Sequence, residues 1–277
     1  MMTERYAVIG NPVAHSRSPM IHAEFARQTG QDMEYGRLLA PLDGFRAAVQ
    51  KFRREGGRGL NVTLPFKLEA FALADQRSQR ALDAQAANTL RFEPDSVFAD
   101  NTDGAGLLRD LEGNLGFGLG GRRILLMGAG GAAQGVLGPL IAARPALLVI
   151  ANRNVDKALR LAQHFAAAAR GSGAQLRAGG YAELAGGSFD LVINATSASL
   201  QGSVPDLPTG VFAPEALAYD MMYGSGPTLF LRCAEGQGAA RLADGIGMLV
   251  EQAAESFLLW RGVRPNTAPV IEKLKAL

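Results

Sequence analysis

A glycine-rich turn carries the clearest chemical signal in the sequence. The apolar run Ile124–Met127 predicts a short buried strand, and a helix is predicted over Ala132–Ile141. Between them, Gly128 and Gly130 lead to Ala133 at G-x-G-x-x-A spacing. This order predicts a dinucleotide site, because glycines let the backbone approach a pyrophosphate and the helix start offers free N–H groups. A turn that only joins the strand to the helix is the alternative interpretation.

The next predicted strand, Leu147–Ala151, ends at residues that bear on the choice of nicotinamide cofactor. Asn152 and Arg153 follow it, with Lys157 one helical turn further on. NAD sites usually carry Asp or Glu here, about 20 residues past the glycines. A carboxylate repels a 2′-phosphate and a guanidinium attracts it, by about 4 kcal/mol each way at ~4 Å in an effective dielectric of ~20. These residues favour NADP over NAD, and a solvated surface arginine is the alternative.

Polar groups in the N-terminal half stand at predicted strand ends or in loops. They are Ser16/Ser18, Asn61/Thr63/Lys67, Asn88 and Asn101/Asp103. Each has a structural explanation. Ser18 and Asp103 would suit helix caps, Asn88 a turn, and Lys67 a solvated first helical turn. Because ligands of open α/β sheets bind outside the carboxyl ends of strands, a binding role is the competing interpretation.

The elements that would position these residues alternate between strand and helix patterns. Strands are predicted at Tyr6–Gly10, Tyr35–Leu39 and Gly59–Thr63, and helices at Met20–Gln28, Gly44–Arg54 and Lys67–Ala74. This order indicates an open α/β sheet. Further predictions are short strands at Asn88–Leu90 and Val97–Ala99, a helix at Ala105–Glu112, and a surface connection over Gly113–Gly121.

A second α/β series begins at Arg122. Its predicted strands are Ile124–Met127, Leu147–Ala151, Leu191–Asn194 and Ala216–Asp220. The last long helix is predicted over Gly247–Trp260, with an apolar stripe broken by Glu251, Gln252, Glu255 and Ser256. We therefore predict two open α/β domains, residues 1–103 and a Rossmann-type nucleotide domain at 104–245. The C-terminal helices, 246–277, are expected to pack back on the first domain, and the strand ends of both halves to face a shared cleft.

Composition narrows the class of protein. The 277 residues are 48% hydrophobic and 19% charged, which suits globular domains and argues against disorder. A net charge of +2 is too small to suggest a nucleic-acid partner. The single Cys233 rules out an internal disulfide, and three His with one Cys predict no metal site. The absence of a signal-peptide pattern and of an apolar run of about 18 residues predicts a cytoplasmic protein without a membrane partner.

Taken together, the motifs resemble the shikimate dehydrogenase family. The stretches that carry the resemblance are HSRSP, NVTLPFK, ANTL, DNTDG, GAGGA, NR, NAT, YDMMY and ADGIGMLVEQA, in the family's order and spacing. They run from Tyr6 to the C-terminal helix, and NVTLPFK and DNTDG are the specific ones. The sequence departs from the family at NATSAS, where a glycine often follows NATS, and at YDMMYGSGPT, where a proline often lies near the tyrosine.

The resemblance implies a reaction and a set of roles. The reaction is reversible reduction of 3-dehydroshikimate by NADPH, a step of chorismate and aromatic amino-acid biosynthesis. Lys67 would be the acid/base group and Asp103 its partner. The implied substrate ligands are Ser16 and Ser18 for the carboxylate, with Thr63, Asn88, Asp103, Tyr223 and Gln252. The implied cofactor residues are Gly128, Ala129, Gly130, Gly131, Ala132, Asn152, Arg153, Asn154, Lys157, Met221 and Gly245.

These residue types suit the implied chemistry. A lysine beside a secondary alcohol can accept its proton while the cofactor takes the hydride. A polyhydroxylated ring needs many polar partners, because unpaired buried polar groups cost about 1–3 kcal/mol each. Burial of Lys67 would favour the neutral amine, whereas a neighbouring Asp103 would favour the ammonium, and both alternatives stay open.

Other functions compete with this one. A quinate/shikimate dehydrogenase of broader specificity is the first, because such pockets discriminate weakly against an added hydroxyl. A non-catalytic NADP-binding regulator is the second, and the presence of Lys67 and Asp103 argues against it. An unrelated Rossmann enzyme, such as a folate dehydrogenase, would not account for the serine pair before Pro19 or for DNTDG. Monomer and homodimer both stand.

Overall fold

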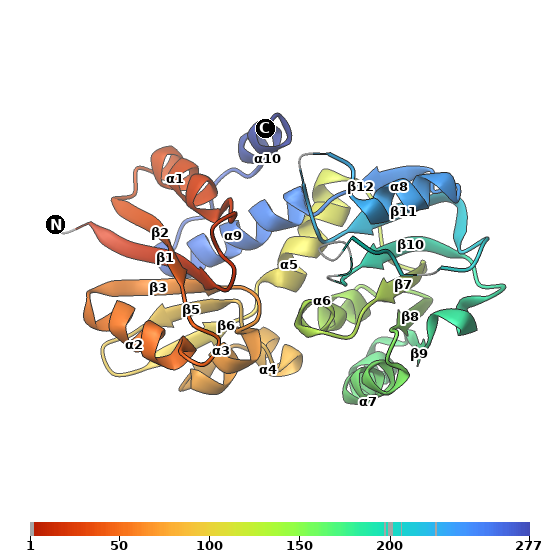
Figure 1. Ribbon diagram of the computed structural model, residues 1–277, viewed down its shortest axis with the longest axis horizontal. Helices are drawn as coiled ribbons and strands as arrows, with labels where there is room; N and C mark the ends of the chain where they lie inside the picture. The colour runs from red at the N-terminus through yellow and green to blue at the C-terminus, as the bar shows by residue number, and fades with distance from the viewer. Residues whose placement is uncertain (1–2, 197, 199–201, 206, 225) are drawn as a thin grey trace. The chain divides into compact units, whose positions relative to one another are not determined.

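The computed structural model describes residues 3–196, 198, 202–205, 207–224 and 226–277. Its contacts divide the chain into two compact units (Figure 1). Unit 1 comprises Met1–Leu107 and Leu249–Ala276, and unit 2 comprises Leu108–Met248 with Leu277. The segment after residue 248 thus belongs with the N-terminal unit. The domain boundaries expected after residues 103 and 245 stay predictions about functional domains.

Unit 1 is built on a six-stranded sheet with the order β2-β1-β3-β5-β6-β4. The strands are β1 (Glu4–Gly10), β2 (Met33–Leu39), β3 (Gly57–Val62), β4 (Gln76–Arg77), β5 (Thr89–Phe92) and β6 (Val97–Asp100). β1, β2 and β3 are parallel, and β5 runs antiparallel to both β3 and β6. Consequently β3 and β6 point the same way, and the start of β5 lies at the edge where β3 and β6 end.

Helices flank this sheet. They are α1 (Ser18–Thr29), α2 (Phe45–Arg54), α3 (Lys67–Leu73), α4 (Gln79–Ala84), α5 (Asp103–Leu108), α9 (Ile246–Arg261) and α10 (Ala268–Lys275). One core is aliphatic and aromatic and includes Phe45, Leu60 and Phe66. Another packs rings from α1, β2 and α9 around His22, whose imidazole stacks on Tyr35 with centroids 4.1 Å apart and an interplanar angle of 6°.

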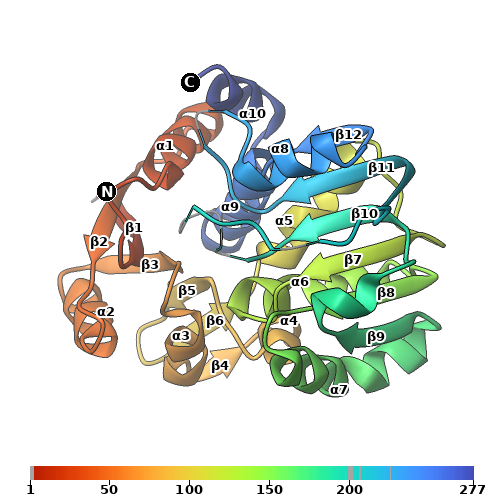
Figure 2. The same cartoon turned by 45° about the vertical axis from the view of Figure 1, so that its right-hand side comes forward.

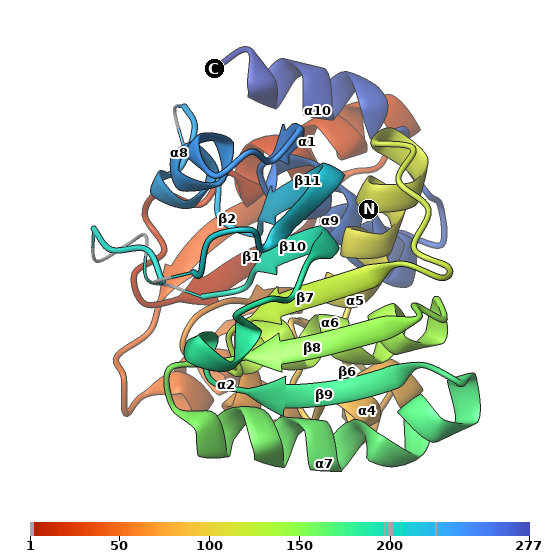
Figure 3. The ribbon, with the colours of Figure 1, turned by 90° about the vertical axis from the view of Figure 1, so that its right-hand side faces the viewer.

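Unit 2 is a six-stranded parallel sheet with the order β12-β11-β10-β7-β8-β9 (Figures 2 and 3). The strands are β7 (Arg123–Met127), β8 (Leu147–Ala151), β9 (Gln175–Gly179), β10 (Phe189–Asn194), β11 (Phe212–Asp220) and β12 (Arg241–Ala243). The helices are η1 (Arg109–Asn114), α6 (Gly131–Ala142), α7 (Val155–Ser172), η2 (Tyr181–Leu184) and α8 (Leu229–Gly236). This is the Rossmann strand order, and the order reverses between β7 and β10. The predicted fold class, two open α/β domains, is confirmed.

One local prediction is wrong, and a second is correct in extent but not in helix type. The stretch 113–121 is not merely a surface connection, because Phe117 and Leu119 are buried at 5% and 0% exposure. The many glycines in this stretch favoured a surface loop, although Phe117 and Leu119 are apolar and pack into the interior. The helix expected over Ala105–Glu112 is split into α5 and the π-helical turn η1.

Within the described part of the chain, we find no helix long and apolar enough to cross a membrane. The same residues contain no group of three or more His, Cys, Asp or Glu side chains arranged to hold a metal ion.

Candidate active site

One edge of the unit 1 sheet collects the predicted polar motifs. Lys67 begins α3 shortly after β3 ends, and Asp103 begins α5 shortly after β6 ends. Asn88 immediately precedes β5. Since β3 and β6 are parallel and β5 is antiparallel to both, these three positions meet at one edge. The alternation of strand directions therefore explains why motifs far apart in the chain converge.

Lys67 and Asp103 form a direct ion pair. Lys67 Nζ lies 2.5 Å from Asp103 Oδ2, and the two side chains are 16% and 7% exposed. The structural interpretation of Lys67 as a solvated residue is therefore wrong. The backbone N–H of Asp103 donates to Asn101 Oδ1 at 3.1 Å, so the side chain of Asn101 supports the start of α5. The Asp103 carboxylate takes no part in this bond and pairs with Lys67.

Asn88 holds the same carboxylate from its other side. Its Nδ2 donates to Asp103 Oδ1 at 2.9 Å and to Gln252 Oε1 at 3.2 Å. Its Oδ1 accepts from the backbone N–H of Thr102 at 2.8 Å. Asn88 is 3% exposed. The amide is thus fixed in one orientation, and the interpretation of Asn88 as a simple turn residue is insufficient.

Gln252 reaches this cluster from α9. A Cβ added to Gly106 of α5 would lie 2.7 Å from Gln252 Cβ, so only glycine permits this approach of the two helices. The Gln252 amide also donates to the backbone carbonyl of Leu249 at 2.8 Å. The structure therefore brings together Lys67, Asp103, Asn88 and Gln252.

Ser16 and Ser18 form a second group after β1. Ser16 Oγ donates to Ser18 Oγ at 3.1 Å, and Arg37 donates to the carbonyl oxygen of Ser16 at 2.6 Å. Ser18 is the first residue of α1 and Arg17 occupies the cap position, so the predicted Ser18 cap is wrong. Thr63 follows β3, where a Cβ on Gly10 would lie 2.4 Å from its methyl group.

The glycine turn of unit 2 lies where the strand order reverses. Gly128 has φ +107°, and a Cβ there would lie 3.1 Å from the carbonyl oxygen of Ala195, beyond the end of β10. Any other residue would be strained at this position. In contrast, a Cβ on Gly130 or Gly131 would meet open space among the described residues. With Ala129 and Ala132 the turn leads into α6, and these residues fit a pyrophosphate.

Asn152, Arg153, Asn154 and Lys157 follow β8 as predicted. Asn154 is the N-cap of α7, and its Oδ1 accepts from the backbone N–H of Lys157 at 3.1 Å. Asn152 donates to the carbonyl of Asn154 at 2.9 Å. Arg153 and Lys157 are exposed. Burial raises the pKa of Tyr181 to about 12 and the positive charge of Arg153 opposes this rise. The two cations fit a phosphate group.

Met221 follows β11 and Gly245 follows β12, and the two residues lie side by side. A Cβ on Gly245 would lie 2.3 Å from the carbonyl oxygen of Met221, so the two backbones are in contact. Tyr223 follows in the same stretch and is half-buried. The departure at NATSAS falls partly outside the described residues, because residues 197 and 199 are among those not described.

Comparison with known proteins matches three parts of the chain to models of one family. Residues 8–90 match the shikimate dehydrogenase substrate binding domain, 112–201 shikimate/quinate 5-dehydrogenase, and 245–275 the shikimate 5'-dehydrogenase C-terminal domain. The shikimate dehydrogenase (NADP(+)) of Aromatoleum aromaticum is 63% identical over 275 residues, covering 99% of this chain and 98% of that protein. The chain belongs to the shikimate dehydrogenase family.

Solved structures agree with this membership. The Ael1 enzyme from Pseudomonas putida is 54% identical with a TM-score of 0.88, covering 98% of both chains. Shikimate 5-dehydrogenase from Thermus thermophilus, in complex with NADP(H) and shikimate, is 33% identical with a TM-score of 0.85, covering 99% of both. The predicted resemblance is confirmed.

Two buried polar residues beside the candidate site, Asn61 and Ser256, have no role predicted from the sequence. The sequence groups Asn61 with Lys67. In the structure, Asn61 Nδ2 donates to Ser256 Oγ at 2.8 Å and its Oδ1 accepts from the Tyr35 hydroxyl at 2.7 Å. Gln252 and Ser256 both break the predicted apolar stripe of the last long helix, and the family resemblance implies a role for Gln252 alone. Their spacing of four residues was the available signal, since it places them on one helix face.

Proposed function

We propose that this chain catalyses the reversible NADPH-dependent reduction of 3-dehydroshikimate to shikimate, a step of aromatic amino-acid (chorismate) biosynthesis. The observation that carries the proposal is the buried Lys67–Asp103 pair, fixed by Asn88 beside Gln252. A lysine held against a carboxylate at a sheet edge can exchange a proton with a substrate hydroxyl. The NADP-dependent relatives named above support the same reaction.

Lys67 is the proposed proton-transfer group. During reduction the Lys67 ammonium donates a proton to the carbonyl oxygen that becomes the alcohol, and during oxidation the neutral amine takes it back. The Asp103 carboxylate, 2.5 Å away, orients the lysine and balances its charge in the reducing direction. Because Asn88 already donates to Asp103 Oδ1, the carboxylate cannot swing away from Lys67 without losing that bond.

The remaining side chains bind and orient the ring. The Ser16 and Ser18 hydroxyls are the proposed donors to the substrate carboxylate. Thr63, Asn88, Asp103, Tyr223 and Gln252 are the proposed partners of the ring hydroxyls. Their amide, carboxylate and hydroxyl groups offer both donors and acceptors, which a ring with several hydroxyls requires.

Unit 2 is the proposed NADP site. NADPH supplies the hydride when bound. The turn Gly128–Ala132 would hold its pyrophosphate and Arg153 with Lys157 its 2′-phosphate, while Asn152, Asn154, Met221 and Gly245 would line the rest. We also propose a cytoplasmic enzyme, monomeric or homodimeric, without nucleic-acid or membrane partners. The net charge of +2 argues against a nucleic-acid partner, and the lone Cys233 fits a reducing compartment.

The test is to measure the rate of oxidation of shikimate and of quinate, each with NADP or NAD, from the absorbance of the reduced cofactor at 340 nm. We expect the highest kcat/KM with shikimate and NADP. Comparable values with quinate would favour the broader quinate/shikimate dehydrogenase, and no turnover with any pair would favour a non-catalytic regulator.

The Asp103→Asn variant tests the substrate site directly. The amide keeps the shape of Asp103 but loses the charge that faces Lys67, so we expect a lower kcat together with a higher KM for shikimate. An effect confined to the KM of NADP would remove Asp103 from the substrate site.

A further inference from the structure

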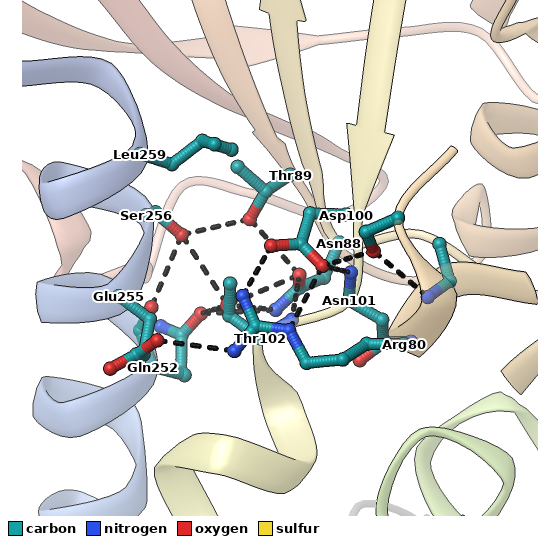
Figure 4. A network of polar contacts seen from close by, with 12 residues as sticks. Arg80, Asn88, Thr89, Asp100, Asn101, Thr102, Gln252, Glu255, Ser256 and Leu259 are labelled. Carbon is teal, nitrogen blue, oxygen red and sulfur yellow. Dashed lines mark hydrogen bonds and ion pairs between the residues drawn. The ribbon is translucent and has the colours of Figure 1, made fainter. Parts of the chain in front are cut away.

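Arg80 joins two acidic side chains that belong to different elements (Figure 4). From α4, its Nε donates to Asp100 Oδ1 at 3.1 Å and its Nη2 pairs with Asp100 Oδ2. Its Nη1 donates to Glu255 Oε2 of α9 at 3.1 Å. The carboxylates are 3% and 10% exposed, and Arg80 itself is 39% exposed. One guanidinium fork therefore links the end of β6 to α9.

Asp100 connects Arg80 to the turn that ends at Asp103. Asp100 Oδ1 accepts from the backbone N–H of Asn101 at 2.7 Å and from Ser78 Oγ at 2.5 Å. Asn101 Oδ1 in turn accepts from the backbone N–H of Asp103 at 3.1 Å. The carboxylate that binds Arg80 thus holds the backbone that places Asp103.

Glu255 connects Arg80 to the helix that carries Gln252. It lies on α9, three residues after Gln252 and directly before Ser256. Ser256 Oγ lies 2.8 Å from Thr89 Oγ1, and Gln252 accepts from Asn88. A shift of α9 would therefore move Gln252 relative to Asn88 and Asp103.

We propose that Arg80 is a positioning residue that sets the distance between Asp103 and Gln252 while its own contacts are to Asp100 and Glu255. The proposal rests on the proposed function, in which both residues bind the substrate ring. A misplacement of about 1 Å at such a site can cost on the order of 100-fold in rate. Because Arg80 connects the segment before Asp103 to the helix that carries Gln252, it affects substrate binding as well as folding.

Arg264 provides a matched control. It pairs with Glu255 and with Glu251, the latter at 2.6 Å, so it neutralises the same acidic helix as Arg80. Both of these carboxylates lie on α9, whereas Arg80 also binds Asp100 on β6. Removing Arg264 leaves a charge imbalance on α9, and the link between α9 and β6 is retained.

The experiment compares Arg80→Met and Arg264→Met by thermal unfolding and by steady-state kinetics. We expect both to lower Tm, because each removes one guanidinium from a pair of largely buried carboxylates. We expect only Arg80→Met to raise the KM of shikimate, by about 10-fold or more, with a fall in kcat and an NADP KM within about 2-fold of the wild type. Arg80→Lys should recover part of the Tm but little of the KM, since an ammonium cannot reproduce the fork.

A wild-type shikimate KM in Arg80→Met, or an equal rise in Arg264→Met, would overturn the positioning role. If Arg80→Met does not fold, Asp100→Asn serves instead, since it retains an acceptor for Asn101 and weakens the bond to Arg80. Gln252→Ala and Asp103→Asn are measured alongside. Unchanged shikimate kinetics in both would reject the proposed site itself, whereas altered kinetics there with an unchanged Arg80→Met would reject only the role of Arg80.

Discussion

The two units present their functional residues in opposite ways. In unit 1 the candidate site consists of side chains that hydrogen-bond one another and are largely buried, as Asn88 and Asp103 show. In unit 2 the candidate cofactor site consists of a glycine turn, followed along the chain by the exposed side chains of Arg153 and Lys157. The first arrangement is organised before a ligand arrives, and the second is a turn with open space around it.

The difference follows from the ligands that each site suits. A small ring with several hydroxyls is recognised only if each donor and acceptor is matched, so its side chains must be held in advance. A pyrophosphate carries strong charge, and backbone N–H groups at a helix start can bind it without any side chain. Disturbing unit 1 should therefore harm chemistry and substrate binding, and disturbing unit 2 should harm cofactor binding.

The largest effect is expected for Lys67→Ala. Loss of the proton-transfer group should lower kcat by about 10²- to 10⁴-fold, with little change in the KM of shikimate. Lys67→Arg is the control, because it retains a positive charge beside Asp103 and cannot release its proton. Both variants should show a low rate of absorbance change at 340 nm, and near-normal turnover in either would reject Lys67 as the acid/base group.

The next largest effect is expected to be the difference in stability between Gly128→Ala and Gly130→Ala. Gly128→Ala places a Cβ 3.1 Å from a carbonyl oxygen at φ +107°, so it should lower the stability of the free protein by about 1–3 kcal/mol and raise the KM of NADP. Gly130→Ala, at φ −96° with open space around it, should raise the KM of NADP with little loss of stability. Denaturant unfolding of the free protein distinguishes them, and equal losses of stability would contradict the contrast.

The cofactor preference should respond more moderately to Arg153→Asp. Replacing an attractive charge by a repulsive one should raise the KM of NADP by about 10- to 100-fold, roughly 1.5–3 kcal/mol, and change the KM of NAD far less. Lys157→Asp, one turn away, should act in the same direction. Equal changes for both cofactors would remove Arg153 from the 2′-phosphate site.

The smallest effect on catalysis is expected for His22, which influences the pH dependence of folding in unit 1. Burial lowers the pKa of His22 from 6.5 to about 3. Between these values the unfolded chain binds a proton that the folded chain excludes, so His22 destabilises the protein as pH falls from about 6.5 to 3, by up to about 1.4 kcal/mol per pH unit. A hydrogen bond with the Asn61 side chain opposes the effect of burial in part. His22→Phe removes the titratable group and keeps a planar ring that can stack on Tyr35.

Urea unfolding of the wild type and of His22→Phe at pH 6.5, 5.5 and 4.5 measures this slope. The variant should lose less stability than the wild type on acidification, and parallel curves would contradict the role of His22. The kinetic constants of the two proteins at pH 7 serve as the check that the active site is intact.

Much of unit 2 could be predicted from the sequence. A short apolar strand, a glycine turn and a helix are set by interactions between neighbouring residues, and Gly128 and Gly130 follow directly from the space a backbone needs near a phosphate. The same local reasoning placed Arg153 and Lys157 after β8. It failed at residues 113–121, because whether Phe117 and Leu119 are buried depends on what packs over them.

The site of unit 1 was decided by tertiary structure. Lys67 and Asp103 are 36 residues apart, and they meet because β5 runs antiparallel between β3 and β6. Gln252 comes from 164 residues beyond Asn88, and the absence of a side chain on Gly106 lets its helix approach. The sequence by itself determined which residue types were available and the local elements that carry them. Strand direction, register and close helix packing determined which of them touch, because those depend on contacts between segments that no local pattern encodes.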